Sequence, residues 1–510
     1  MKTSEDVFQL IKSLNKTEKR YFKLYASLQK GDKGYLQLFD AIEKQVVYDE
    51  ERILAKFKQE RFTNNFSVVK AYLYQSVLKS MRLYSSSASV QILLREMIAD
   101  IQFLFERGLF KQAGKLIEKA KQMAYKYEYH LVLLEIISQE TLLLRTRYHL
   151  VKTEVEIEKL NEESARVMEK HKEINHYLSL ASKIVIWVNK KGHARKQSEV
   201  QKYGQHIKEM LREVEKTTLS YKANLIFYFS CIAGLDSIGD YEAAYAGSAK
   251  ILKIMEAHPH QIEEKPVPYV RALHNFGLCQ MRLNNFKEAS HTITKMQRLH
   301  FRSPKVAADV FILMSILELT LLARTGNFGE GLQAIPKIEK KLKGLGLPSA
   351  LEKYDIQFNY SFAYICFGAK QYSLSKKYLN KIVNDPQKNY AHDLQSLARI
   401  LSLIIYFESG DQDMVQYFEK STSRFLKRKE QLFRTEQLLL HFIRKEDAGS
   451  FAKSDLISKF KKLLSELRKI VEDPLENSVL MNLNVIAWVE SKIHGKTFAD
   501  VVKVKLVAST

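Results

Sequence analysis

Proline, glycine and cysteine are scarce in this sequence: its 510 residues include only 8 Pro, 19 Gly and 3 Cys. Because few residues interrupt helices, and because Leu, Ile, Lys, Glu and Ala are abundant, the composition favours long helices joined by short turns. The alternation of apolar and polar residues that marks a half-buried strand is hard to find. The sequence therefore predicts an all-α protein.

The three cysteines, Cys231, Cys279 and Cys366, are odd in number and far apart along the chain. This spacing argues against a disulfide framework and matches no familiar zinc site. Each cysteine falls in a segment that we expect to be the first helix of a repeat. We therefore expect buried, reduced thiols in a cytoplasmic protein.

Long apolar runs are also missing. No stretch of about eighteen uninterrupted apolar residues, the length that spans a bilayer, occurs, and the best candidate, residues 401–407, stops at Glu408. The first six residues lack the apolar core of a signal peptide. We expect a cytoplasmic protein that does not engage a membrane.

Sequence motifs of catalysis are absent. A nucleophile elbow, a phosphate-binding Gly-Lys-Ser/Thr loop and a zinc-protease His-Glu pair are all missing. His258 and His260 lie close to Glu263 and Glu264, but their spacing is that of an ordinary loop rather than of a metal site. We expect neither an enzyme nor a cofactor or metal.

What the chain does contain is a signature that returns every forty-odd residues. A hinge of Gly or Asn is followed by an aromatic residue and then by Ala or Gly, as in Gly239-Asp240-Tyr241-Glu242-Ala243-Ala244. The aromatic markers Tyr241, Phe286, Phe328 and Tyr372 are separated by 45, 42 and 44 residues. The earlier marker Phe110 lies 131 residues before Tyr241, three times about 44. Such a period predicts a stacked array of helical hairpins.

Two weaker hinges are expected near residues 147–149 and 191–193, and another, without the aromatic, at 409–411. The array would then hold about eight hairpins.

These units resemble tetratricopeptide repeats. Phe276-Gly277 in the first helix, Phe286 after the hinge and Ala289 fall at that family's spacing, and the first unit matches through Gly108, Phe110, Ala113 and Ala120. The period is about ten residues longer than the family's usual 34, and the early Trp and terminal Pro of its consensus are missing. The resemblance implies a right-handed α-solenoid with a groove lined by first helices. It leaves the subfamily open.

The repeat covers only part of the chain, so we divide the sequence into three. Residues 1–84 read as a helical N-terminal domain, with a winged-helix-like DNA reader as one form of it. Residues 85–425 are the repeat array. Residues 426–510 are C-terminal capping helices, which an array needs to cover its exposed core edge.

The formal net charge is +22, from 80 Lys and Arg against 58 Asp and Glu. Such an excess favours acidic partners, including nucleic acid, although solvated helix faces rich in Lys also produce it. If the N-terminal domain binds DNA, Lys70 and Arg82 would meet phosphates and Gln75 a base edge. Lys79 belongs to the same candidate set. Two basic patches, 190–196 and 424–429, would suit single-stranded nucleic acid.

The function that these features favour is a non-catalytic scaffold that binds a protein or peptide in the groove. Two alternatives stay open: a ligand-responsive transcriptional regulator with N-terminal DNA-binding helices, and an RNA-binding protein that uses the basic surface. The sequence leaves the oligomeric state undefined. The candidate groove residues, chosen by helix position, are Asn224, Tyr228, Asn275, Gln357, Tyr360 and Tyr364.

Overall fold

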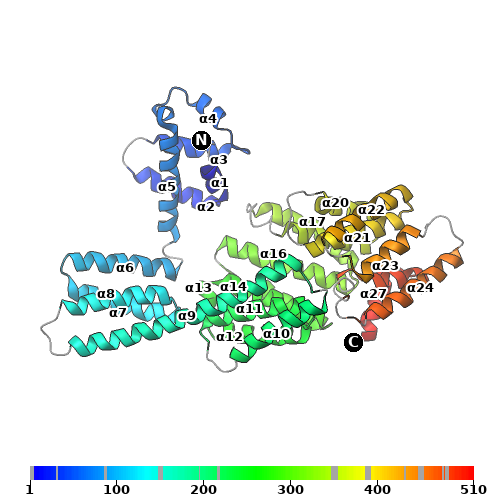
Figure 1. Ribbon diagram of the computed structural model, residues 1–510. Helices are drawn as coiled ribbons and strands as arrows, with labels where there is room; N and C mark the ends of the chain where they lie inside the picture. The colour runs from blue at the N-terminus through cyan, green and yellow to red at the C-terminus, as the bar shows by residue number, and fades with distance from the viewer. Residues whose placement is uncertain are drawn as a thin grey trace. The chain divides into compact units, whose positions relative to one another are not determined.

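The computed structural model describes residues 5–29, 33–85, 89–146, 153–194, 196–214, 219–301, 303–345, 354–384, 392–429, 432–445, 453–471, 473, 476 and 482–509. Within these ranges every regular element is a helix, which confirms the all-α prediction. The chain separates into two compact units, one that includes the residues up to His171 and one that begins at Lys172. Figure 1 shows the helices coloured from blue at the N-terminus to red at the C-terminus.

The first unit begins with a helical group that has its own hydrophobic core. Its second helix starts as expected, because Asn15 and Glu18 form a reciprocal capping box. In the long helix that ends the group, Phe66, Leu73 and Val77 are buried, as their spacing predicts. No β-hairpin accompanies these helices in the described residues, so these residues form no wing. The elements are α1 (Asp6–Ser13), α2 (Lys16–Leu28), α3 (Gly34–Lys44), α4 (Glu50–Lys56), the 3-10 helix η1 (Arg61–Asn65) and α5 (Phe66–Ser85).

A second core in the first unit is built by the hairpin of α6 (Val90–Glu106) and α7 (Phe110–Lys126), by α8 (His130–Arg145) and by the start of α9 (Thr153–Lys191). Ala113 and Ala120 of α7 are completely buried. These small residues let the helices approach closely, as the repeat pattern predicts. The hinge expected near residues 147–149 lies outside the described residues.

The second unit continues the same plan. Its hairpin helices are α10 (Gln197–Val214), α11 (Tyr221–Ser237), α12 (Tyr241–Glu256), α14 (Pro266–Arg282), α15 (Phe286–Gln297), α16 (Pro304–Arg324), α17 (Phe328–Gly344), α19 (Asp355–Gly368), α20 (Tyr372–Val383), α21 (His392–Glu408) and α22 (Gln412–Arg428), with a short α13 (Pro259–Glu264). The chain ends with α23 (Arg434–Lys445), α24 (Lys453–Val471), α26 (Val485–His494) and α27 (Phe498–Ser509). The three-part division drawn from the sequence stays a prediction, and its boundary at 425 falls inside α22.

The hinges share one backbone geometry. The hinge residue has a positive φ at Gly108, Gly192, Gly239, Asn284, Gly326, Lys370 and Gly410. In six of these hinges, all but that of Gly192, the next N–H donates to the carbonyl five residues earlier, for example Asn285 to Gln280 at 2.8 Å and Gln371 to Cys366 at 2.8 Å. This is the Schellman motif, which ends a helix with a residue in the left-handed region. The hinges expected near 192 and 410 are therefore present.

Packing follows the chain order. First helices contact each other in sequence, with α14 against α16, α16 against α19 and α19 against α21, and each second helix contacts the next first helix. This pattern is consistent with helical repeats. The three cysteines lie buried and unbridged in α11, α14 and α19, as expected.

One described helix, α16, is long and apolar enough to cross a bilayer by length and composition. The sequence predicts no membrane span, because polar residues interrupt every long apolar run. It packs against α14, α15, α17 and α19, and half of its most apolar window is buried. A helix surrounded by other helices is apolar on all sides. This packing accounts for its composition.

Candidate functional site

The second unit contains a cavity of about 600 Å³ between the first helices α14, α16 and α19 and the C-terminal segment. This volume lies in the range of pockets that hold small ligands or peptide side chains. Among the described residues, its lining contains three cations and no Asp or Glu. The lining residues with polar side chains are Tyr241, Arg282, Asn284, Thr320, Arg324, Gln357, Tyr360, Ser361, Tyr364, Asn482, Asn484 and Lys505.

Two arginines at the end of first helices are held in fixed orientations in this lining. The Nε of Arg282 donates to Asp236 Oδ1 at 3.2 Å, and its guanidinium carbon lies 5.4 Å from the centre of the Tyr241 ring. Arg324 donates from one nitrogen to Met281 O and to Asn284 Oδ1, each at 3.1 Å. Burial and the neighbouring charge of Arg282 lower the pKa of Arg324. Two guanidinium groups are thus positioned side by side at one wall.

Behind Arg282 lies a partly buried cluster of charged side chains. The Nε2 of His193 lies 3.6 Å from Asp236 Oδ2, and its Nδ1 lies 3.3 Å from Asp393 Oδ2. Burial by itself would lower the pKa of His193, but hydrogen bonds with both carboxylates raise it. Burial would raise the pKa of Asp236, but Arg282 and His193 lower it to about 2. A Cβ at Gly192 would collide with the Asp393 carboxylate, so this hinge requires glycine for its packing as well as its φ.

The opposite wall is formed by residues of the C-terminal segment, which two tyrosines of α19 hold through main-chain atoms. Tyr360 OH donates to Asn482 O at 3.1 Å, and Asn484 N–H donates to Tyr364 OH at 3.2 Å. Burial raises the pKa of Tyr364 to about 12 and that of Tyr360 well above its usual value. Both hydroxyls are therefore neutral at physiological pH and able to donate and accept.

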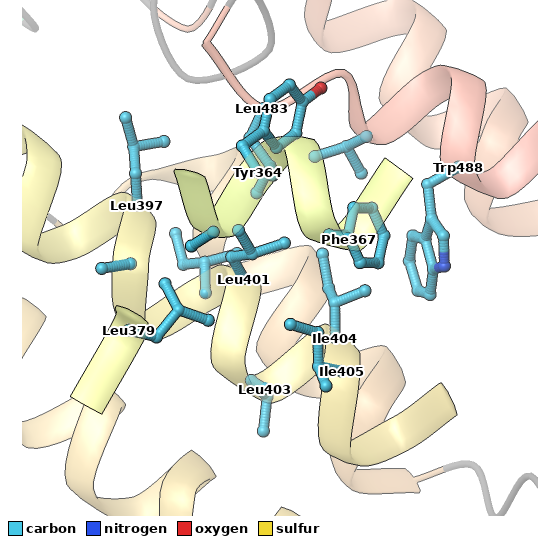
Figure 2. Close-up of a cluster of buried hydrophobic side chains, with 14 of the residues drawn as sticks. Tyr364, Phe367, Leu379, Leu397, Leu401, Leu403, Ile404, Ile405, Leu483 and Trp488 are labelled. Carbon is cyan, nitrogen blue, oxygen red and sulfur yellow. The ribbon is translucent and has the colours of Figure 1, made fainter. Parts of the chain in front are cut away.

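Beyond the cavity, α26 contacts the end of α21, and α27 contacts α17 and α19. The Nε1 of Trp488 donates to Glu408 Oε1 at 2.6 Å, and Lys492 pairs with the same carboxylate. Figure 2 shows Trp488 and Leu483 beside Phe367 and the isoleucines and leucines of α21. The segment is thus held by an apolar core as well as by hydrogen bonds.

The last helix, α27, closes over a hinge. Phe498 stacks on Phe328 at a centroid distance of 5.4 Å. A Cβ at Gly326 would lie 3.0 Å from Ala499 O and 3.3 Å from Val502 Cβ. This glycine therefore serves both the left-handed hinge and the close approach of α27.

The structure brings together only half of the expected groove residues. Gln357, Tyr360 and Tyr364 line the cavity. Asn224, Tyr228 and Asn275 are not part of its described lining. The amide of Asn224 donates to Leu219 O and Ser220 O of its own chain segment, and Tyr228 is buried in the core.

The four candidate nucleic-acid contacts all lie on α5, in different environments. Lys70 is mostly buried and pairs with Glu50 at 2.8 Å. Gln75, Lys79 and Arg82 are exposed, and their spacing places them on one face of the helix. Three of the four side chains therefore face solvent together, while Lys70 is occupied by a carboxylate.

No group of three or more His, Cys, Asp and Glu side chains in the described part could hold a metal ion. Burial raises the pKa of Cys231 and Cys366 to about 12 and that of Cys279 to about 11. These thiols are therefore protonated at neutral pH and are poor nucleophiles.

Sequence reasoning missed the arginines of the cavity and the C-terminal residues that face them. The arginines had a signal: Arg282 and Arg324 both stand four residues before a hinge aromatic, Phe286 and Phe328. Asn482, Asn484 and Lys505 had none, because their position depends on a segment more than a hundred residues later in the chain returning to α19.

No protein-family model matches the chain, and no similar protein was found among the curated proteins. The resemblance to tetratricopeptide repeats therefore rests on the hinge and packing residues of this chain alone. The molecule is an all-helical protein whose helices pack in sequence, with no family assigned.

Proposed function

We propose that this chain is a non-catalytic scaffold with the architecture of a right-handed, tetratricopeptide-like solenoid, and that it binds a protein or peptide in the cytoplasm along its first helices. One observation carries the proposal: the array already holds a polypeptide, its own residues 482–484, through the hydroxyls of Tyr360 and Tyr364. Hydrogen bonds to main-chain atoms are a general means of holding an extended peptide, whatever its side chains.

The cavity beside this segment gives the partner a chemical character. Arg282, Arg324 and Lys505 line it, and its described lining contributes no carboxylate. Arg282 and Lys505 already pair with Asp236 and Glu490 outside the lining. A segment that carries Asp or Glu would therefore add to these ion pairs from the cavity side. The net charge of +22 favours the approach of such a partner.

Site-specific photo-crosslinking tests the proposal. A photoreactive residue at Gln357, in the cavity, should yield a covalent adduct with a protein when the full chain is irradiated in a native lysate. The matched control places it at Lys340, which is exposed on α17. Equal adducts from both positions, or none from Gln357, would contradict groove binding. Adducts with nucleic acid would favour the RNA-binding alternative.

The exposed face of α5 supports a second candidate function, a transcriptional regulator that binds DNA through Gln75, Lys79 and Arg82. Contacts to phosphates make binding fall steeply with salt. Retention of the full chain on DNA at low salt, weakened by Lys79→Ala and Arg82→Ala together, would support it. Absence of retention at low salt would remove it.

A further inference from the structure

A recess on the surface of α21 and α22, separate from the cavity, gathers cations without an anion. Its volume is about 480 Å³. Four of its lining residues are basic, and its described lining contains no Asp or Glu. The lining residues are Arg399, Tyr417, Lys420, Ser421, Arg424, Phe425 and Arg428.

Two arginines of the recess, one partly buried and one exposed, share one aromatic ring. The guanidinium carbon of Arg399 lies 4.3 Å from the centre of the Phe425 ring, and that of Arg428 lies 5.9 Å from it. Arg399 donates to Val383 O at 3.3 Å, whereas its Nε is buried and has no hydrogen-bond partner in the described part of the chain. Burial and the charge of Arg428 lower the pKa of Arg399. Two like charges therefore lie at one ring, and a buried donor of Arg399 has no partner among the described residues.

None of the four cations forms an ion pair with a carboxylate among the described residues. Neighbouring helices show the contrast, because Lys492 pairs with Glu408 and Lys505 with Glu490. Lys420, Arg424 and Arg428 are exposed, so solvent screens their charges, whereas the buried Arg399 donor without a partner costs free energy. A bound anion would give that donor a partner and would balance the four charges.

The residues of α22 in this lining follow the helical period. Tyr417, Lys420, Ser421, Arg424 and Arg428 are spaced by three, one, three and four residues, which places them on one face. The Tyr417 ring is 66% exposed at the edge of this face. The face thus offers charge, a hydroxyl donor and a flat aromatic surface.

We propose that this recess binds a phosphate group. Guanidinium forks match the oxygens of phosphate, and a doubly charged oxyanion gains more from four cations than a monovalent ion does. Ser421 adds a hydroxyl donor, and the exposed Tyr417 ring lies where the group that carries the phosphate would emerge. Phosphate on a nucleotide and phosphate on a phosphorylated peptide share this chemistry. The site is independent of the scaffold proposal.

Titration calorimetry on the full chain, with inorganic phosphate as the probe, tests the site against potassium chloride of equal ionic strength. We expect phosphate to bind the wild-type protein, and Arg399→Gln and Arg428→Gln each to weaken binding at least tenfold. Lys340→Gln, which removes one exposed charge from α17, should leave the affinity within twofold. Phosphate heat equal to that of chloride, or wild-type affinity in both arginine variants, would overturn the proposal.

Two further probes identify the carrier of the phosphate. A nucleoside monophosphate and a phosphoserine peptide are compared with their unphosphorylated forms on the same proteins. Tighter binding of one phosphorylated probe, lost with Arg399→Gln, supports the site and names its carrier, and equal binding of both supports a site that reads the phosphate alone. Binding that does not depend on the phosphate refutes the proposal. Because Arg428 lies near the exposed end of α22, Arg428→Gln keeps the test decisive if Arg399→Gln fails to fold.

Discussion

The cavity beside the C-terminal segment and the recess on α22 are both lined by cations, but they differ in whether those cations form ion pairs with carboxylates. At the cavity, Arg282 pairs with Asp236 and Lys505 with Glu490. At the recess, Arg399 and Arg428 flank one phenylalanine without a carboxylate among the described residues. Paired charges contribute to the folded state itself, whereas unpaired ones favour a ligand that supplies the missing anion.

This contrast predicts which substitutions destabilise the protein. Side chains at the cavity should be costly to remove because a carboxylate then loses its charged partner. Side chains at the recess should be less costly to remove, since none of them pairs with a described carboxylate and Arg399 loses only a bond to Val383 O and its contact with the Phe425 ring.

The largest expected effect is at Trp488, which fastens the C-terminal segment. The side chain is 2% exposed and its indole N–H bonds Glu408. Trp488→Ala should therefore cost about 3–5 kcal/mol of unfolding free energy, the usual penalty for a large buried side chain. Tyr417→Ala, at the exposed edge of the recess, should change it by less than about 0.5 kcal/mol. Urea unfolding followed by circular dichroism measures both, and similar costs for the two would contradict the contrast.

A smaller difference in unfolding free energy is expected between the same substitution at two arginines, one in the cavity and one in the recess. Arg282→Gln leaves the Asp236 carboxylate with His193 but without its arginine partner and should destabilise the protein by about 1–3 kcal/mol. Arg399→Gln removes a like-charge contact but also the bond to Val383 O and the contact with the Phe425 ring, so it should cost about 1 kcal/mol or less, because no carboxylate loses its partner. Unfolding curves in phosphate-free buffer provide the comparison. Equal losses at both sites would mean that Arg399 is a structural residue rather than a ligand-binding one.

The helices and most of their hinges were predictable because their determinants are local. A Schellman hinge depends on a residue that tolerates positive φ and on the few residues beside it in the chain. Gly239 and Asn284 therefore indicate their hinges from the sequence alone. The inward face of α5 was predictable for the same reason, since Phe66, Leu73 and Val77 follow the helical period.

The cavity was not predictable because its walls are distant in the sequence. Tyr360 and Tyr364 were chosen by helix position, but their partners Asn482 and Asn484 follow about 120 residues later. No local pattern encodes the return of a segment to an earlier helix. Tyr228 was predicted to line the groove because it lies on a first helix. In the structure it packs against Phe227 and other buried side chains and belongs to the core.

The smallest expected effect is a pH dependence at the cluster behind the cavity. His193 faces Asp236 from α11, Asp393 from α21 and Arg282 from α14. Because the carboxylates raise its pKa above 6.5 in the folded protein, its charged form adds stability that is complete below about pH 6.5 and is lost as the pH rises through the raised pKa. His274 gives the opposite sign, because burial lowers its pKa to about 4. Its contribution is complete above about pH 6.5 and is lost as the pH falls toward 4.

The two histidines can therefore be separated by the pH at which each substitution acts. The difference in unfolding free energy between wild type and His193→Gln should be largest between about pH 5 and 6 and should shrink at alkaline pH. Wild type should lose stability between pH 6.5 and 4 more steeply than His274→Gln does. Urea unfolding at half-unit steps of pH measures both differences. A His193 difference that stays constant with pH would show that the pair of carboxylates does not hold a charged imidazole, and that the cavity wall is fixed by Arg282 and Asp236 alone.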